Sequence, residues 1–227
     1  MSARDGCAGT PVPRCAGTPV PRCAWFLSLD TATDFPTLAL GTPDLPGEDL
    51  RIADRRALSR EIEGAVAELC RARGVAPRDI AGVVIADGPG SFTGLRIGAA
   101  FAKGLCRALG VPLLAAPSLA GAAVRAAERA GCARPLEVVA CYDALRGERF
   151  RAVFRVARDG VEVVSGPALA PAHGAEALTG VVRADERDAS AAVLLSLVGR
   201  PGGPRAGGAP PGGPPVYGRL AAAEARR

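Results

Sequence analysis

The sequence contains a single histidine, His173, among 227 residues, and this scarcity limits the chemistry open to it. A zinc site built on several histidines, or a catalytic triad with a histidine base, is hard to assemble here. Cysteine is more frequent, but seven cysteines make an odd number and include no C-x-x-C pair. The sequence therefore indicates neither a disulfide framework nor a zinc centre, and we expect a reducing compartment.

Long apolar runs are missing as well, although 48% of the residues are hydrophobic. The stretch 111–124 is interrupted by Pro112 and Pro117, and it is too short to cross a bilayer. The N-terminus lacks the apolar region of a secretory signal. We expect a cytoplasmic globular protein that can bury a substantial core.

The net charge is +5 and the isoelectric point is near 9. Such a balance would suit contact with nucleic acid or another polyanion. The arginines are scattered, however, and acidic residues lie among them in 51–60 and 185–188. A solvated basic surface is the simpler interpretation, and a direct nucleic-acid groove remains the alternative.

The two ends of the chain have the composition of segments that do not fold. Residues 7–14 recur unchanged as residues 15–22, and such a repeat buries too little apolar surface to form structure. We expect residues 1–24 to be a disordered repeat tail. Residues 200–227 are predicted to be a Gly/Pro-rich linker and C-terminal tail.

The segments between these ends alternate between strand and helix patterns, which predicts an α/β fold. An apolar stripe at Leu58, Ile62, Val66 and Leu69 predicts an amphipathic helix over 55–73. The other predicted elements are a hairpin from 25–29 and 37–40, strands at 83–86 and 111–115, a helix over 95–109, and an alanine-rich helix ending near residue 131.

A second unit repeats the plan of a strand, an aspartate turn and a strand. Residues 137–142 and 148–156 flank a turn at Asp143, as the hairpin strands flank Asp30. A further helix is predicted over 189–198. These patterns predict an N-terminal α/β lobe over 25–131 and a reduced second α/β lobe over 132–199.

The most specific motif is GPGSFTGLRIG, residues 88–98, between a strand and a helix. It is neither a P-loop, since no G-K-[ST] ends it, nor a G-x-G-x-x-G turn. Its backbone could cradle a phosphate. Alternatively, Gly94, Gly98 and Ala102 form a stripe of small residues where a partner helix could approach closely. Spacing alone leaves both interpretations open.

A second candidate site follows the first strand. Asp30, with Thr31 and Thr33, could hold a hydrated magnesium ion or a phosphate, and Asp143 offers a second carboxylate. The simpler alternative is ordinary turn chemistry, since Asp and Thr side chains often bond nearby backbone N–H groups.

These motifs resemble the TsaB (YeaZ) family. Besides GPGSFTGLRIG, the shared segments in family order are LSLDTATDFPTLAL from Leu27, DALRGERF from Asp143 and PVYGR near the C-terminus. The resemblance spans residues 25–219. It implies two duplicated lobes of the actin, Hsp70 and sugar kinase type, with a ribonuclease H-like core and a smaller second lobe.

The resemblance also implies a role. Family members are non-catalytic relatives of TsaD, which transfers a threonylcarbamoyl group to adenosine 37 of tRNAs that read codons starting with A. This chain would be a scaffold and activator that dimerises with TsaD, joined by the ATPase TsaE, with tRNA held indirectly through the complex. A homodimer through the same helices is a further option. The chain itself would need no cofactor, although the assembled complex could hold ATP or ADP with Mg²⁺.

Site residues follow from the same resemblance. No catalytic or metal residue is expected, because 118–124 reads SLAGAAV where TsaD-type catalysts carry histidines. The expected partner interface comprises Leu58, Ile62, Arg96, Gly98, Phe101, Ala102 and Leu105. A vestigial phosphate site would comprise Asp30, Thr31, Gly88, Gly90 and Ser91.

The chain departs from the family pattern at Leu145, where an arginine is usual and Arg146 follows instead, and in the Gly/Pro-rich segment 199–215. Two other functions remain open. One is an independent nucleotide-binding ATPase or phosphotransferase that uses Asp30 and Asp143. The other is a free-standing RNA binder.

Overall fold

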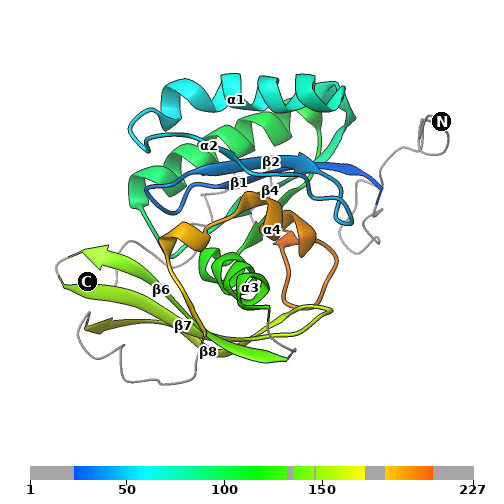
Figure 1. The fold of residues 1–227 in the computed structure, drawn as a ribbon. Helices are drawn as coiled ribbons and strands as arrows, with labels where there is room; N and C mark the ends of the chain where they lie inside the picture. The colour runs from blue at the N-terminus through cyan, green and yellow to red at the C-terminus, as the bar shows by residue number, and fades with distance from the viewer. Residues whose placement is uncertain (1–22, 132–134, 146, 172–181, 207–227) are drawn as a thin grey trace.

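The computed structural model describes residues 23–131, 135–145, 147–171 and 182–206. Most of the predicted N-terminal tail, the solitary His173 and the PVYGR motif lie outside the described residues. The described chain forms four layers: a pair of helices, a six-stranded sheet, a second pair of helices and a four-stranded sheet (Figure 1).

The six-stranded sheet has the order β10-β5-β4-β1-β2-β3. Its strands are β1 (Trp25–Asp30), β2 (Thr37–Gly41), β3 (Leu50–Arg51), β4 (Ile80–Ala86), β5 (Leu113–Ala116) and β10 (Arg205–Ala206). Strands β1 and β2 are antiparallel, with Leu27 opposite Leu40, which confirms the predicted hairpin. Strands β1, β4 and β5 are parallel. All of β4 is buried because helices cover both faces of the sheet.

Helices α1 (Leu58–Arg73) and α2 (Phe92–Leu109) cover one face of this sheet (Figure 1). The predicted stripe on α1 is confirmed as buried, and the helix ends at Gly74, whose φ of 64° is the left-handed conformation that glycine adopts easily. Helix α2 begins before the predicted residue 95. The hydroxyl of Ser91 accepts a hydrogen bond from the Gly94 N–H and caps the first turn.

The other face is covered by α3 (Ser118–Ala130) and α4 (Ala191–Ser196), which lie between the two sheets (Figure 1). Beneath them the four-stranded sheet has the order β8-β7-β6-β9. Its strands are β6 (Leu136–Leu145), β7 (Glu148–Val156), β8 (Val161–Pro171) and β9 (Val182–Ala184). The described residues also form two short 3-10 helices, η1 (Pro77–Asp79) and η3 (Glu186–Asp188).

The antiparallel pairing of β6 with β7 confirms the second predicted pair of strands. Strand β8 is an unpredicted element, because it is an edge strand that is exposed over most of its length. Helix α4 contacts β1 and β2, and β10 adds to the edge of the six-stranded sheet. The chain after β9 therefore returns to the first lobe, and Arg205 and Ala206 form a strand where the sequence predicts only linker.

One hydrophobic cluster joins the two sheets through the central helices. It contains Phe26 and Val84 of the six-stranded sheet, Tyr142 of the four-stranded sheet, and Leu119 and Leu194 of α3 and α4. A second cluster lies between α1, α2 and the six-stranded sheet. Within the described ranges, no helix has the length and apolar character that crossing a membrane would require.

Candidate functional site

Asp30 ends β1 and is completely buried. Its Oδ1 atom accepts a hydrogen bond from the Ala32 N–H at 3.1 Å. Among the described residues, no group lies within hydrogen-bonding geometry of Oδ2. Burial raises the pKa of this carboxyl from 3.8 to about 7, because the charged form loses its hydration. Thr31 and Thr33 are buried too, and Thr33 Oγ1 accepts from the Phe35 N–H. The local contacts are those of a turn.

Three backbone N–H groups of the glycine-rich turn are bonded within the chain. The Ser91 N–H donates to the Ala32 carbonyl at 2.6 Å, and the Gly88 N–H donates to Ser118 Oγ at 2.9 Å. The Gly94 N–H is used by the Ser91 cap. A phosphate cradle needs free N–H groups that converge on the anion, so these three donors are not available for one.

The glycines of this turn allow a close approach between two segments of the same chain. A Cβ atom at Gly90 would overlap the Ala32 carbonyl, and one at Gly94 or Gly98 would overlap Thr31. The sequence predicts that the stripe through Gly98 receives a partner helix. The structure shows that the neighbour is instead the turn that follows β1.

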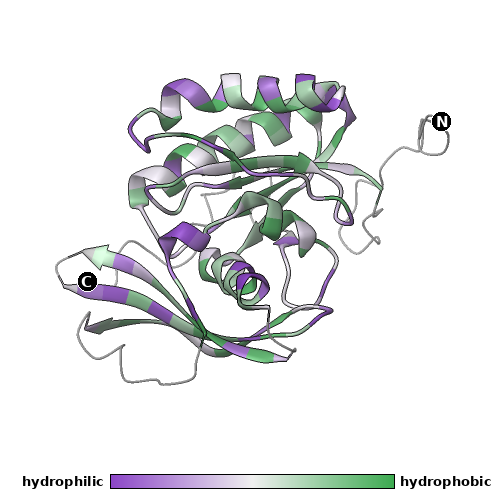
Figure 2. Cartoon of the chain, in the orientation of Figure 1, coloured by the Kyte–Doolittle hydropathy of each residue, from purple (hydrophilic) through white to green (hydrophobic). Residues whose placement is uncertain are grey.

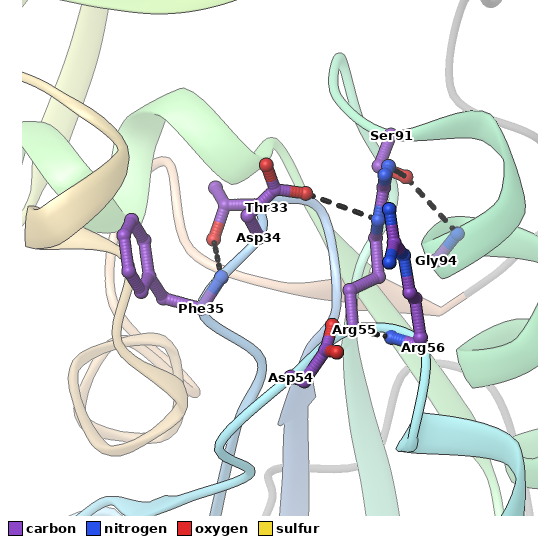
Figure 3. Close-up of polar contacts among 8 residues, drawn as sticks. All are labelled: Thr33, Asp34, Phe35, Asp54, Arg55, Arg56, Ser91 and Gly94. Atoms are coloured by element: carbon purple, nitrogen blue, oxygen red, sulfur yellow. Dashed lines mark hydrogen bonds and ion pairs between the residues drawn. The ribbon is translucent and has the colours of Figure 1, made fainter.

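Arg55 lies just before α1 and contacts both the glycine-rich turn and the turn that follows β1 (Figure 3). Its guanidinium donates to Ser91 Oγ at 2.6 Å and forms an ion pair with Asp34, with 3.0 Å between Nε and Oδ1. Beside it, the Arg56 N–H donates to Asp54 Oδ1. No local sequence pattern distinguishes Arg55 from the other arginines of 51–60.

Two cavities lie where the six-stranded sheet meets β7 and β8, one of about 770 Å³ and one of about 170 Å³. Both are lined by Asp87 and Pro117. Burial raises the pKa of Asp87 from 3.8 to about 6. Gly88 lines the smaller cavity, whereas the other four residues of the expected phosphate site (Asp30, Thr31, Gly90 and Ser91) line neither.

The second expected carboxylate has a different environment. Asp143 is exposed, and its N–H donates to a carboxylate oxygen of Glu186. The neighbour of Asp30 on this strand is Tyr142, whose hydroxyl donates to the Ser118 carbonyl at 3.3 Å. Burial, helped by the negative charge of Asp30, raises the Tyr142 pKa well above its usual value. Leu145 ends β6, and Arg146 lies outside the described residues.

The expected interface residues divide into two groups. Leu58, Ile62, Gly98 and Ala102 are buried within the chain, where they hold α1 and α2 against the sheet and the turn after β1. They are therefore not surface positions that a partner can touch. Arg96 is exposed, and its guanidinium lies 4.6 Å from the centre of the Phe92 ring. Phe101 and Leu105 are half-buried.

The surfaces of α1 and α2 that point away from the sheet carry a different set of small residues. We call this surface the outer helical face; its small residues are Gly64 and Ala67 of α1 and Ala100, Gly104 and Ala108 of α2, all exposed. A Cβ atom added at Gly64 or Gly104 would meet nothing within 4 Å. Polar residues predominate on the outward side of α1, and α2 is more mixed (Figure 2).

Among the described residues, no group of three His, Cys, Asp or Glu side chains is close enough together to hold a metal ion. The candidate site therefore consists of a turn whose hydrogen bonds are made within the chain, two cavities beside Asp87, and an outer helical face that carries small residues.

Comparison with known proteins places the chain in a family. The family model described as "TsaD: tRNA N6-adenosine threonylcarbamoyltransferase" matches residues 52–182, which is more than half of the chain. A tRNA threonylcarbamoyladenosine biosynthesis protein TsaB of Bacillus subtilis (strain 168) is 36% identical over 81 residues, covering 36% of this chain and 33% of that protein. The TsaB protein of Escherichia coli (strain K12) is 30% identical over 135 residues, covering 60% and 57%.

A tRNA N6-adenosine threonylcarbamoyltransferase of Caulobacter vibrioides is 41% identical over 80 residues, which cover 35% of this chain and 22% of that enzyme. The chain thus spans between a fifth and somewhat over half of the length of these relatives.

Two solved structures from Pseudomonas aeruginosa are similar to 65% of this chain. One is YeaZ, with a TM-score of 0.58, 29% identity and coverage of 65% of this chain and 68% of that chain. The other is a protein described as similar to peptidase YeaZ, with a TM-score of 0.59, 29% identity and coverage of 65% and 67%. The two-sheet α/β architecture fits the actin-like, ribonuclease H-like fold that the motifs imply. With the family model and these relatives in agreement, the chain belongs to the TsaB (YeaZ) family.

Proposed function

We propose that this chain is a scaffold and activator subunit in tRNA threonylcarbamoyladenosine biosynthesis. It pairs with a TsaD-type catalytic subunit, which transfers the threonylcarbamoyl group to adenosine 37 of tRNAs that read codons starting with A. The relatives named for this biosynthesis support the pathway, and the match to the transferase family model supports a structurally related partner. A TsaE-type ATPase joins the assembled complex in the cytoplasm, and ATP or ADP with Mg²⁺ would bind there.

The outer helical face is the observation that carries this proposal. Small exposed residues recur along α2 at Ala100, Gly104 and Ala108, four residues apart on one side of the helix. Half-buried Phe101 and Leu105 lie beside them. Small side chains let two helix backbones approach closely, and the neighbouring apolar groups supply area to bury. Two such helices offer enough surface for an interface on the order of 1,600 Å² in total.

The buried turn supports a scaffold more than an autonomous enzyme. An ATPase that used Asp30 would need this carboxylate in contact with bound magnesium or nucleotide. Asp30 is instead buried and lines neither cavity beside Asp87. No contact of the described residues favours the alternative of an independent ATPase or phosphotransferase.

The test is a Gly104→Trp substitution in the full chain. Because nothing lies within 4 Å of a Cβ at Gly104, we expect the variant to fold while its indole ring prevents a partner helix from docking. Co-purification with the TsaD-type subunit should be lost, together with stimulation of tRNA modification in the reconstituted reaction. Gly166→Trp on β8 is the matched control, since Gly166 also has nothing within 4 Å.

Gly98→Trp would not serve, because the ring would overlap Thr31 and the fold itself would suffer. Undiminished co-purification of Gly104→Trp, with the circular dichroism spectrum of the unmodified chain, would refute the outer helical face as the docking surface. Size-exclusion chromatography of the chain alone tests the homodimer, which should dissociate in the same variant if the same face forms it.

A further inference from the structure

The outward face of the four-stranded sheet gathers three arginines around one cysteine. Side chains alternate between the two faces of a strand, and the inward residues of β6 and β7, such as Tyr142 and Phe150, are buried in the core. Cys141 of β6 lies opposite Arg151 of β7, so both belong to the outward face. The banded colouring of these strands shows the same alternation (Figure 2).

Two more arginines share this face. Arg149 of β7 lies opposite Asp143, and Arg183 of β9 lies opposite Val139, the outward neighbour of Cys141 on β6. Arg149 is two residues from Arg151 on β7, and Arg183 is opposite a residue two positions from Cys141, so the three arginines surround Cys141 on this face. We call Arg149, Arg151 and Arg183 the arginine face.

The arginine face has unused hydrogen-bonding capacity. Arg155, four residues beyond Arg151 on β7, forms ion pairs with Glu137 at 3.1 Å and Glu162 at 3.3 Å. Within the part of the chain that the structure describes, the three arginines of the face form no such pair. Among the described residues, the Nε atom of Arg151 is buried without an acceptor, which costs free energy.

The surroundings leave room for an extended ligand. On β8 the residues opposite Arg151 and Arg149 are Ala168 and Ala170, whose short side chains do not rise above the sheet. Two acidic residues lie near the face: Glu186, whose carboxylate is bonded to the Asp143 N–H, and Asp143 itself. The arginines outnumber them, and Arg149 and Arg183 are exposed.

We propose that the arginine face binds the phosphate backbone of an RNA, so that this chain contacts the RNA substrate of the complex directly. Guanidinium groups present paired donors that match phosphate oxygens, and they bind phosphates without reading bases. The choice of RNA over another polyanion rests on the proposed function, since the relatives are named for tRNA modification. Arg149 and Arg151 lie two residues apart on β7, so their guanidinium groups can contact successive phosphates of a single RNA strand.

The test compares the full chain with Arg149→Ala/Arg183→Ala, leaving half-buried Arg151 in place. The probe is an unmodified tRNA transcript, and the binding constant is measured between 50 and 200 mM salt, a range chosen because counterion release is large there. Each lost phosphate contact lowers the slope of log K against log salt by about 1, so we expect the slope to fall by about 2. Affinity at the lowest salt should fall at least about tenfold.

The control is Arg125→Ala/Arg158→Ala, which removes the same charge from two exposed arginines on α3 and the β7–β8 turn. In this control variant, the slope of log K against log salt should equal that of the unmodified chain. Arg149→Lys/Arg183→Lys should keep most of the slope, because lysine keeps the charge. Equal losses in the two alanine variants, or no salt-dependent tRNA binding by the unmodified chain, would overturn the proposal. Co-purification with the TsaD-type subunit should persist in every arginine variant, which separates this test from that of the outer helical face.

Discussion

At the scale of single residues, Asp30 is the group whose chemistry the fold changes most. The sequence offers it as a magnesium or phosphate ligand or as a turn residue, and the structure gives the turn contacts together with complete burial. A completely buried carboxyl whose pKa is raised to about 7 lowers the stability of the fold whenever it is ionised. The sequence cannot reveal this, because burial of Asp30 depends on α4 and the four-stranded sheet closing over it.

This pKa has a definite sign in the pH dependence of stability. The folded value lies above the unfolded value, so the folded state binds more protons between pH 4 and 7, and stability falls as pH rises through that window. Across this window, the shift lowers the free energy of unfolding by an amount on the order of 4 kcal/mol. Asp30→Asn keeps an acceptor for the Ala32 N–H and does not titrate. We therefore expect a smaller stability difference between pH 5 and pH 8 in urea unfolding.

Some pH dependence of the same sign should survive in this variant, because burial also raises the pKa of Asp87 to about 6. An unchanged difference between the two pH values in Asp30→Asn would show that the Asp30 carboxyl is hydrated in the folded chain.

Replacing two glycines of α2 by alanine should change the stability of the chain in opposite directions. A Cβ at Gly94 would overlap the backbone carbonyl of Thr31, whereas one at Gly104 meets nothing within 4 Å. Gly94→Ala should therefore destabilise the chain by about 1–3 kcal/mol through overpacking. Gly104→Ala should stabilise it by up to about 1 kcal/mol, since alanine has the higher helix propensity. Chemical denaturation of both variants measures the difference, and equal effects would contradict the close approach of α2 to the turn after β1.

At the scale of elements, periodicity predicts where helices and strands lie but not which neighbour buries them. The stripe on α1 is confirmed because Leu58, Ile62, Val66 and Leu69 repeat at helical spacing, and all four are buried. On α2, two stripes of small residues have the same spacing, one through Gly94, Gly98 and Ala102 and one through Ala100, Gly104 and Ala108. Only the position of the sheet and of Thr31 decides that the first faces inward.

The missed elements have a similar physical explanation. Strand β8 is an edge strand with Gly166 and Pro167 in its middle and little apolar alternation, so its pairing with β7 stabilises it rather than its own pattern. Asp87 and Arg55 carry no local signal either, because their importance comes from segments far apart in the sequence. The arginine face is likewise formed by residues of β7 and β9, and Arg151 and Arg183 are more than thirty positions apart in the chain.

At the scale of the whole molecule, the two lobes share one core. Leu194 of α4 is completely buried and touches α3 at Gly121, while α4 itself contacts β1 and β2. Helix α3 in turn packs against β6 and β7. If either lobe unfolded alone, it would expose the hydrophobic cluster that joins the two sheets, and this exposure costs free energy. The lobes should therefore unfold in one cooperative transition.

The single tryptophan allows a direct test, because Trp25 lies in β1 of the six-stranded sheet. Its fluorescence should change at the same denaturant concentration as the far-ultraviolet circular dichroism, to which both sheets contribute. Leu194→Ala should cost about 2–5 kcal/mol and move both signals together, because the cavity it leaves lies where the lobes meet. Separate midpoints, or a shift of the Trp25 signal alone, would mean that the four-stranded sheet is stable without α4. In that case the shared cluster would not hold the lobes together.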